Sequence, residues 1–373
     1  MYDIGIIGGG LAGLANAIQM AKAGLKVILF ERQQYPFHRV CGEYISMEAL
    51  PFLQNELEID PFEHGAIQLS EFRLTSPAGR QLIVPLDLGG FGISRYTLDE
   101  LLYQKATEKG VTILQNTIIR QTEKQINHWQ LTTHQEQTFE AKTVIAAYGK
   151  RTQLDQLWKR RFFQQKSPYI GIKYHIKYAY QPLHQIALHN FQQGYCGISR
   201  IEDDKYCLCY LTTRENLRKH QNIAQMEKEV LRKNPFLDHI FDHAEWLYDA
   251  PKVINEVSFA PKKLIEQDGI LMCGDSAGMI APLAGNGMAM ALHSAKILSK
   301  CLIDYQKGDI DQKTMHQNYQ KEWKKYFANR LQRGRQLQSF FGSTLLSELL
   351  VITTKNLPFL AQKLIKQTHG NIF

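Results

Sequence analysis

The first 31 residues constrain the fold more than any other part of the chain. An apolar run at residues 4–7 is typical of a buried parallel strand, and it leads directly into Gly8, Gly10 and Gly13. In such a turn the first glycine permits the bend, the second lets the backbone approach a diphosphate, and the third lets the next helix pack on the sheet. A second apolar run ends in Glu31, an acid that can accept hydrogen bonds from a ribose. Together these features predict a dinucleotide-binding Rossmann-type unit.

A second glycine-rich segment lies near residue 280. A short apolar strand at residues 270–272 is followed by Gly274 and Asp275, and then by Gly285 and Gly287 at the start of a long helix. An Asp at a strand end can bind a sugar-like hydroxyl, and the positive end of a helix stabilises negative charge on a nearby ring. A flavin has both a ribityl chain and a ring that becomes anionic on reduction. The two segments therefore favour FAD over NAD as the resident cofactor.

These segments resemble the FAD-binding motifs of aromatic-hydroxylase-type flavoproteins, the group A flavoprotein monooxygenases. Geranylgeranyl-reductase-like proteins and flavin-dependent halogenases share that framework, although the Trp-x-Trp-x-x-Pro run of the halogenases is absent from this sequence. The resemblance covers about the first 150 residues and residues 255–305. It implies an FAD-dependent oxidoreductase in which an electron donor binds transiently, because no second GxGxxG is present.

Two further segments extend the resemblance toward the flavin. The stretch YPFHRVCGEYIS (35–46) is similar to the Cys-Gly-Glu loop of the reductase-like proteins, which lies near the flavin. This similarity makes Cys41 and Glu43 the candidate catalytic residues. The segment at 94–113 is similar to one in which an arginine contacts FAD, which assigns that role to Arg95.

A third segment departs from the pattern. In TVIAAYGKRT (143–152), Tyr148 stands where related proteins have the Asp of an Asp-Gly pair. In the hydroxylases that pair supports the binding of FAD and NADPH together. NADPH or NADH is thus an open choice as the transient electron donor.

The motifs and the resemblance together define the expected FAD site. Its residues are Gly8, Gly10, Leu11, Ala12, Gly13, Glu31, Arg32, Arg39, Cys41, Gly42, Arg95, Gly274, Asp275, Pro282, Gly285, Asn286, Gly287 and Met288. No metal site is expected. His239 and His243 have helical ligand spacing, but no third ligand accompanies them.

The chain as a whole predicts an α/β protein with two domains and a helical C-terminal region. The expected parts are a discontinuous Rossmann-like FAD-binding domain (1–70, 95–165 and 255–310), an antiparallel-sheet substrate-binding domain (71–94 and 166–254) and the C-terminal helical region (311–373). Within them, residues 66–86 predict a hairpin, and Thr97 with Glu100 predicts a capping box. Lys173 and His175 share one face of an expected strand, where exposure to solvent is at least as well favoured as a place in a substrate cavity.

Composition narrows the class of partner. The formal net charge is +8, yet no basic tract is interleaved with aromatic residues, so no nucleic-acid partner is expected. The six cysteines show no CxxC spacing, no leader is expected before the strand at Tyr2, and no run of about 18 apolar residues occurs, so the sequence predicts a cytoplasmic protein. The apolar segment after residue 340 is either a helical tail over the substrate domain or a peripheral membrane contact.

Three functions stay open at this stage. The first is a monooxygenase acting on a hydrophobic aromatic or polyketide-like molecule. The second is a geranylgeranyl-reductase-like enzyme that saturates carbon–carbon double bonds of a prenyl or lipid substrate, and the third is a non-catalytic FAD-binding protein. The first is favoured, because the Tyr-x-Trp-x-Phe-Pro segment typical of the reductases has Gly197 in place of the Trp and lacks the Phe-Pro pair.

Overall fold

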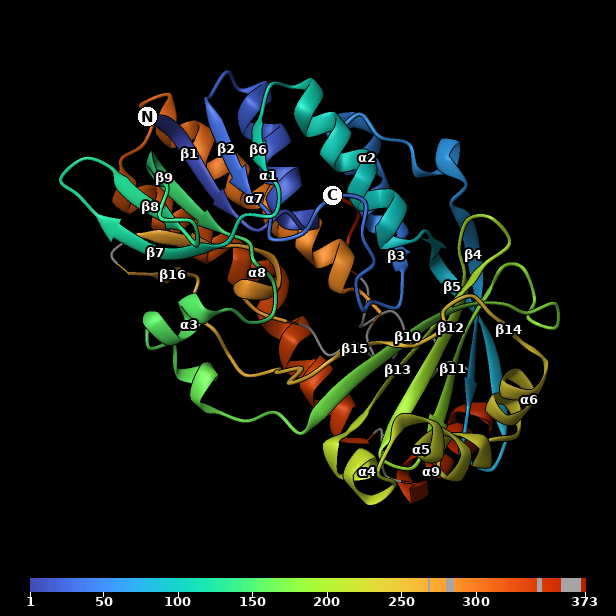
Figure 1. Ribbon diagram of the computed structural model, residues 1–373. Helices are drawn as coiled ribbons and strands as arrows, with labels where there is room; N and C mark the ends of the chain where they lie inside the picture. The colour runs from blue at the N-terminus through green and yellow to red at the C-terminus, as the bar shows by residue number, and fades with distance from the viewer. Residues whose placement is uncertain (268, 280–284, 341–343, 357–369) are drawn as a thin grey trace.

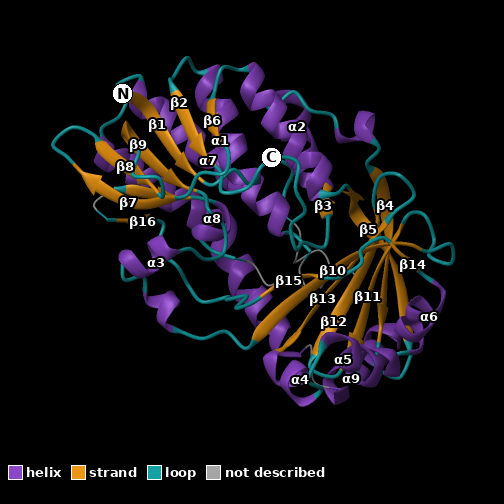
Figure 2. Cartoon of the chain, in the orientation of Figure 1, coloured by secondary structure: helices purple, strands orange, loops and turns teal. Residues whose placement is uncertain are grey.

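A computed structural model shows two β-sheets side by side, each flanked by helices (Figure 1). It describes all residues except 268, 280–284, 341–343 and 357–369. Sheet A contains the N-terminal strand, and sheet B forms the other half of the molecule, as the colouring by secondary structure makes plain (Figure 2).

Sheet A is the nucleotide-binding sheet, with the order β16-β17-β9-β1-β2-β6. Parallel pairing links β17, β9, β1, β2 and β6, and β7 and β8 form an antiparallel meander that returns to β9. The strands are β1 (Tyr2–Ile7), β2 (Val27–Phe30), β6 (Thr112–Leu114), β7 (Ile119–Lys124), β8 (Trp129–Thr133), β9 (Thr138–Ala146), β16 (Ile265–Glu266) and β17 (Ile270–Met272). The carboxyl ends of β1, β9 and β17 therefore meet at one edge, where α/β proteins bind ligands.

Two long helices that follow glycine motifs pack on each other beside sheet A. They are α1 (Leu11–Lys22) and α7 (Gly287–Gln306), and Ser299 donates a 3.0 Å hydrogen bond to Asn16 between them. The other helical segments of this half are α2 (Arg95–Glu108), α3 (Gln153–Leu157), α8 (Gln312–Phe340), and the short turns Met47–Ala49, Phe52–Glu56, Pro61–His64, Arg161–Gln164 and Gly274–Ser276. The packing of α1 on α7 brings the two glycine motifs together.

Sheet B has the order β14-β10-β13-β12-β11-β4-β5-β3, with β15 also paired to β10. Its strands are β3 (Tyr44–Ser46), β4 (Ile67–Thr75), β5 (Gln81–Gly92), β10 (Tyr169–Lys177), β11 (Gln185–Phe191), β12 (Gly194–Arg200), β13 (Tyr206–Thr213), β14 (Glu245–Trp246) and β15 (Lys252–Ile254). All pairs are antiparallel except β11 with β4. The sheet reaches further back along the chain than the expected boundary at residue 71, because β3 pairs with β5 and β4 begins at Ile67.

The two faces of sheet B differ in what covers them. One face packs its apolar residues, such as Ile172 and Leu208, against helices that carry Met226 and Leu237. These helices are α4 (Arg214–Lys219), α5 (Ile223–Glu229) and α6 (Pro235–His243), with a short turn at Leu231–Lys233. The opposite face turns toward the nucleotide domain, and at its far end α9 (Thr344–Asn356) packs Val351 on β4 and β5. The face that meets the nucleotide domain is thus the one available to a ligand.

The expected fold class is confirmed, with one local correction. The α/β architecture, the Rossmann-type sheet, the largely antiparallel second sheet and the C-terminal helices α8 and α9 are all present. The expected capping box at Thr97 and Glu100 is wrong, because α2 begins one turn earlier and Ser94 is its N-cap, accepting from the Thr97 N–H. Ser94 and Thr97 are both polar residues that can cap a helix, and no proline marks where the helix starts. The sequence therefore did not decide between two starting points one turn apart.

Two further observations bear on the class of protein. None of the helices in the described part of the chain is both long and apolar enough to cross a membrane. All six cysteines are free thiols. Four of them are buried and act as small apolar residues of the core.

The glycines of the first motif yield a paired prediction. A Cβ at Gly13 would lie 1.9 Å from the Gly8 carbonyl oxygen, whereas a Cβ at Gly10 would meet, among the described residues, only the Arg95 guanidinium at 3.6 Å. Gly13→Ala should therefore lower the free energy of unfolding of the apoprotein by roughly 1–3 kcal/mol through overpacking. Gly10→Ala should lower it by under about 1 kcal/mol but weaken FAD, because the methyl group stands where the diphosphate approaches. Urea denaturation and FAD fluorescence titration of both variants check this, and equal stability losses would contradict it.

Candidate FAD site

The two glycine motifs meet at the carboxyl edge of sheet A. A Cβ on Gly274 would lie 2.9 Å from the Cβ of Ala12, so the second motif lies directly against the first turn of α1. Gly8 has φ +102°, and a Cβ there would lie 2.5 Å from the Cα of Tyr148 at the end of β9. Both contacts require glycine. Residues from positions 8, 148 and 274 thus surround one point in space.

The start of α1 has the features that bind a diphosphate. Gly10 is the N-cap, and its missing side chain leaves open space up to the Arg95 guanidinium. The free N–H groups of the first turn and the helix dipole favour an anion there. Arg95 is held in place by two hydrogen bonds of 2.7 Å to Asp99, one turn further along α2. The residues present therefore fit the diphosphate of FAD.

Glu31 stands at the end of β2, as the Rossmann pattern predicts. Its Oε2 accepts from the Gly9 N–H at 2.9 Å and from Arg39 at 3.0 Å, and its Oε1 accepts from the Gln33 N–H at 3.0 Å. A carboxylate oxygen has two lone pairs, so Oε1 retains one for a ribose hydroxyl. Arg32, the next residue, is exposed. Through its hydrogen bond from the Gly9 N–H, Glu31 also holds the glycine-rich turn in place.

The loop of residues 39–43 is held against sheet B through its backbone. Lys173 Nζ donates to the Arg39 carbonyl at 3.1 Å, Cys207 Sγ to the Cys41 carbonyl at 3.2 Å, and Ser199 Oγ to the Gly42 carbonyl at 3.1 Å. A Cβ on Gly42 would meet no atom of the described residues within 4 Å. The loop therefore turns its bonded side to the sheet, while Gly42 borders open space that a ligand can approach.

Glu43 is the most heavily bonded residue of this loop. Its Oε1 accepts from Lys173 Nζ at 2.5 Å and from the Arg95 N–H at 2.7 Å, and its Oε2 lies 2.6 Å from His175 Nε2. The residue has φ +53°, an unusual conformation for a non-glycine residue, and the carboxylate is fully buried. Burial alone would raise the pKa of Glu43, but the Lys173 ammonium and the His175 hydrogen bond outweigh it and lower the pKa to about 2.

The second motif places Asp275 at the end of β17. Its carboxylate has no hydrogen bond to another residue in the described ranges, and its backbone oxygen accepts from Lys262 Nζ at 2.7 Å. Burial lowers the pKa of Lys262 to about 8, although the charge of Asp275 opposes that shift. Gly285 has φ +65° and lies against the ring of Tyr44, and α7 begins at Gly287. The carboxylate is thus available to a hydroxyl of the cofactor.

Three other expected FAD ligands of this segment have different surroundings. Asn286 and Met288 are buried beside the start of α7, so it is their backbone that lies nearest the helix end. Pro282 lies outside the described residues. Leu11 is likewise buried in the core, and its place in the site is that of its backbone N–H.

Tyr148, the departure from the Asp-Gly pair, belongs to a buried network. Its hydroxyl donates to Asp155 Oδ1 at 2.5 Å and accepts from Arg160 Nη1 at 2.8 Å. Arg160 also bonds Glu266 at 3.0 Å and the carbonyl of Ser276 at 2.9 Å. The tyrosine therefore ties the end of β9 to the second glycine motif without a carboxylate at position 148.

Sequence reasoning missed several residues of this site. Asp99 pairs with both Arg95 and Arg39, and its signal was the i,i+4 spacing from Arg95 on α2. Lys173 and His175 share one strand face as predicted. The expectation of exposure to solvent is wrong, because both side chains are buried and contact the Glu43 carboxylate. Strand alternation says which residues share a face and does not say what covers that face.

One group of described residues has the spacing of metal ligands, namely Glu43, His175 and Cys207, with ligand atoms within 4.8 Å of one another. We assign no metal to this trio, because the Lys173 ammonium already neutralises the carboxylate. His239 and His243 are stacked on each other, with ring centroids 4.0 Å apart.

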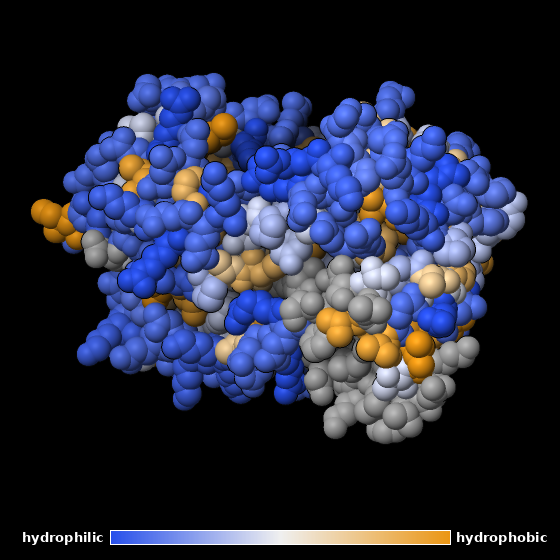
Figure 3. Space-filling model, turned by 90° about the horizontal axis from the view of Figure 1, so that it is seen from below, coloured by the Kyte–Doolittle hydropathy of each residue, from blue (hydrophilic) through white to orange (hydrophobic). Residues whose placement is uncertain are grey.

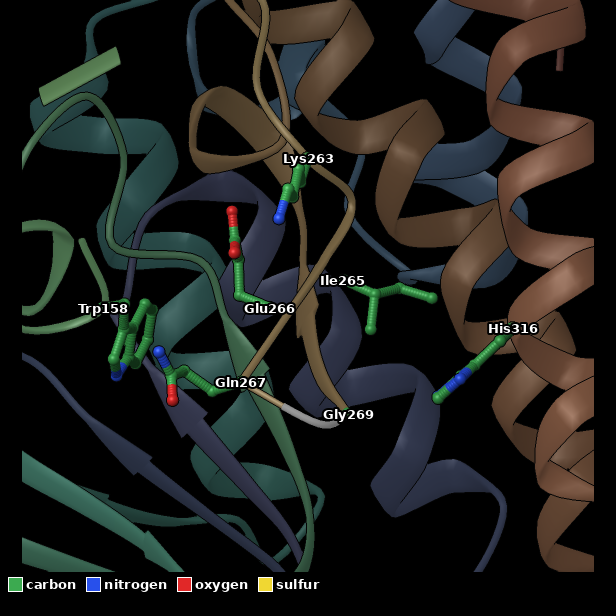
Figure 4. Close-up of a pocket in the computed structure, with 7 residues that line it drawn as sticks. All are labelled: Trp158, Lys263, Ile265, Glu266, Gln267, Gly269 and His316. Carbon is green, nitrogen blue, oxygen red and sulfur yellow. The ribbon is translucent and has the colours of Figure 1, made fainter. Parts of the chain in front are cut away.

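A large pocket has Glu266 of the Arg160 network in its lining, but none of the other site residues described above. Its volume is about 670 Å³, and Figure 4 shows Trp158 and His316 at opposite sides of it. The lining residues are Trp158, Lys263, Ile265, Glu266, Gln267, Gly269 and His316. None of the expected FAD ligands in the described part of the chain lines this pocket, so its size does not make it the cofactor site.

The fold and the geometry define an FAD-binding protein with a Rossmann-type domain and a second sheet over the flavin side. The chain belongs to the family described as FAD binding domain, whose model matches residues 1–333. It is thus an FAD-dependent oxidoreductase.

Individual relatives are more distant. Conditioned medium factor receptor 1 of Dictyostelium discoideum is 22% identical over 371 residues, covering 88% of this chain and 68% of that protein. Digeranylgeranylglycerophospholipid reductase of Methanocaldococcus jannaschii is 24% identical over 350 residues, covering 87% and 82% of the two chains. The solved structure of the flavin-dependent brominase Bmp2 has a TM-score of 0.80 at 20% identity, covering 98% of this chain and 93% of that one. At that identity the likeness shows the shared fold.

Asp275 gives the sharpest test of the site. Asp275→Ala removes a carboxylate that is free to bond the cofactor, and hydrogen bonds to a charged group contribute roughly 1.5–3 kcal/mol, so FAD affinity should fall about 10- to 100-fold. Fluorescence titration of apoprotein with FAD measures this. Asp309→Ala, at an exposed position beyond the far end of α7, is the matched control and should bind FAD normally. Equal affinities of the two variants would show that the cofactor does not use Asp275.

Proposed function

We propose that this flavoprotein reduces carbon–carbon double bonds of an apolar, prenyl-like small molecule. The observation that carries the proposal is the Cys41-Gly42-Glu43 loop, which is bonded to three strands of sheet B and borders open space at Gly42. The loop therefore stands between the expected flavin position and the ligand-facing side of sheet B. The bound flavin supplies hydride transfer, and the protein must supply orientation and a proton.

The surroundings of the loop support an apolar substrate. Two apolar clusters, one around Tyr195 and Leu211 and one around Tyr44 and Leu69, lie on this side of the molecule. Ile186 and Leu188 on β11 are only partly buried where they join these clusters. Such surfaces suit a hydrophobic molecule and offer little to a charged one.

A monooxygenase is the second candidate. Sequence alone favoured it because Gly197 replaces the Trp typical of the reductases. In the described structure, the atom nearest to a Cβ on Gly197 would be a backbone oxygen at 3.7 Å. The ligand-facing side of sheet B thus has extra room, which suits a bulky ring system. The order is reversed here because a reductase relative is matched over 82% of its own length, whereas a halogenase relative is matched over 65% of its own length.

Other expectations about partners stay predictions. A small hydrophobic substrate and the absence of a nucleic-acid partner follow from the apolar surfaces and the charge pattern. NADPH or NADH is proposed as a transient donor, and Tyr148 makes reduction by another reduced-flavin source an equal alternative. Peripheral membrane contact through the C-terminal region is supported by α9, where Leu349 and Ile352 are exposed. Figure 3 views the molecule from the α9 end of Figure 1 and shows apolar side chains gathered there in a mostly hydrophilic surface.

An isotope experiment separates the two reactions. Holoenzyme, a reduced-flavin source and ¹⁸O-labelled dioxygen are incubated with prenyl and aromatic candidates, in parallel with an anaerobic sample. Mass spectrometry should find a gain of two hydrogens that needs no oxygen. Incorporation of one labelled oxygen atom would contradict the proposal and support the monooxygenase.

Cys41 tests whether the loop takes part in the reaction. Cys41→Ser should bind FAD near normally but change turnover, because its thiol lies in the loop that borders the open space at Gly42. Cys301→Ser, near the far end of α7, is the control and should leave turnover unchanged. Wild-type turnover in Cys41→Ser on a verified substrate would mean that this thiol has no part in the chemistry.

A further inference from the structure

Two cationic side chains are buried on the face of sheet B that meets the nucleotide domain. Lys173 is 0% exposed and His175 is 3% exposed, and both lie on β10. A lysine is almost never fully buried unless it is paired. Both side chains reach the same carboxylate, that of Glu43, from a strand 130 residues away in the sequence.

Lys173 also closes a circuit of polar contacts around the start of the FAD site. Glu31 bonds Arg39, Arg39 bonds Asp99, and Asp99 bonds Arg95. The Arg95 N–H bonds Glu43, Glu43 bonds Lys173, and Lys173 Nζ returns to the Arg39 carbonyl. The circuit links Glu31, the first turn of α2 and the 39–43 loop, and Lys173 connects it to sheet B.

The arrangement is better suited to holding geometry than to adding stability. A buried ion pair gains little over well-packed apolar residues, because desolvation offsets the attraction. The bonds of Lys173 and His175 go to the loop and, through Glu43, to the N–H of Arg95, whose guanidinium lies 3.6 Å from the place of a Cβ on Gly10. Their effect therefore falls on groups that face the cofactor.

We propose that Lys173 and His175 are positioning residues for FAD, which act by holding the Glu43 carboxylate and with it the 39–43 loop and the first turn of α2. This inference rests on FAD binding and not on the reaction that the flavin catalyses. Reductase and monooxygenase would need it equally.

The charge of Lys173 is central to this role. The titratable or charged groups that face Glu43 from the surrounding elements are Lys173 and His175 of β10, Arg95 of α2, Cys207 of β13, Tyr248 and, from its own loop, His38. Burial, followed by the charges of Lys173 and His175, lowers the pKa of His38 to about 4, and burial raises the pKa of the Cys207 thiol. At neutral pH Lys173 is thus the ammonium that neutralises Glu43. Without it, burial would raise the pKa of Glu43 into the range where it titrates.

The experiment measures FAD binding to apoprotein by fluorescence titration between about pH 5 and pH 8, together with thermal melting. Lys173→Met should raise the Kd for FAD about tenfold at pH 7 and make it pH-dependent, whereas wild-type binding should be nearly flat. Lys173→Arg, which keeps the charge, and the double variant Lys173→Met/Glu43→Gln, which removes both charges, should each recover to within about threefold of wild type.

Lys177→Met is the matched control. Lys177 lies on the same strand and the same face, but it is exposed and pairs with Glu245 at 3.3 Å. Its removal should change neither the Kd nor the pH profile. A Lys173→Met protein that melts lower but binds FAD with wild-type Kd and a flat profile would overturn the proposal and leave Lys173 a stabilising residue. Should Lys173→Met fail to fold, His175→Gln decides, and unchanged FAD affinity in that variant would overturn the proposal as well.

Discussion

The pairing of buried charges around Glu43 is the constraint on which the rest of this site depends. A carboxylate taken out of water is tolerated when cations and N–H groups occupy its oxygens. Here those groups come from α2 and from β10, so the nucleotide domain and sheet B must meet in one relative position. The unusual backbone conformation of Glu43 is held by these same bonds. The 39–43 loop is thus fixed by its contacts with sheet B and not by its own sequence.

The same principle explains how the second glycine motif is held. Arg160 is almost fully buried, and its guanidinium donates to Asp155, Glu266 and the Ser276 carbonyl. Tyr148 joins this network with a neutral hydroxyl, which removes the need for another buried charge at that position. The loops at these strand ends are therefore held by hydrogen bonds and ion pairs between elements, while the strands and helices supply the apolar core.

Much of the fold follows from local patterns. Apolar runs with glycine turns gave the parallel strands of sheet A, and alternating segments between residues 169 and 213 gave the antiparallel core of sheet B. Two expectations failed for different reasons. The start of α2 was ambiguous because Ser94 and Thr97, one turn apart, can both cap a helix, and Ser94 is the residue that does so. The burial of Lys173 depends on a carboxylate 130 residues earlier, which the local sequence does not show.

The sequence by itself determined the class of this protein. Glycines at positions 8, 13 and 274 are needed because a Cβ there would clash, and such glycines are typical of turns from a strand into a helix at a nucleotide. The sequence also predicted the positions of Glu31 and Asp275, because each follows an apolar strand and so lies at that strand's carboxyl end. Tertiary structure decided what surrounds the 39–43 loop. The partners of Glu43 come from two separate segments, α2 and β10, and their meeting is set by the packing of two domains, which no local spacing encodes.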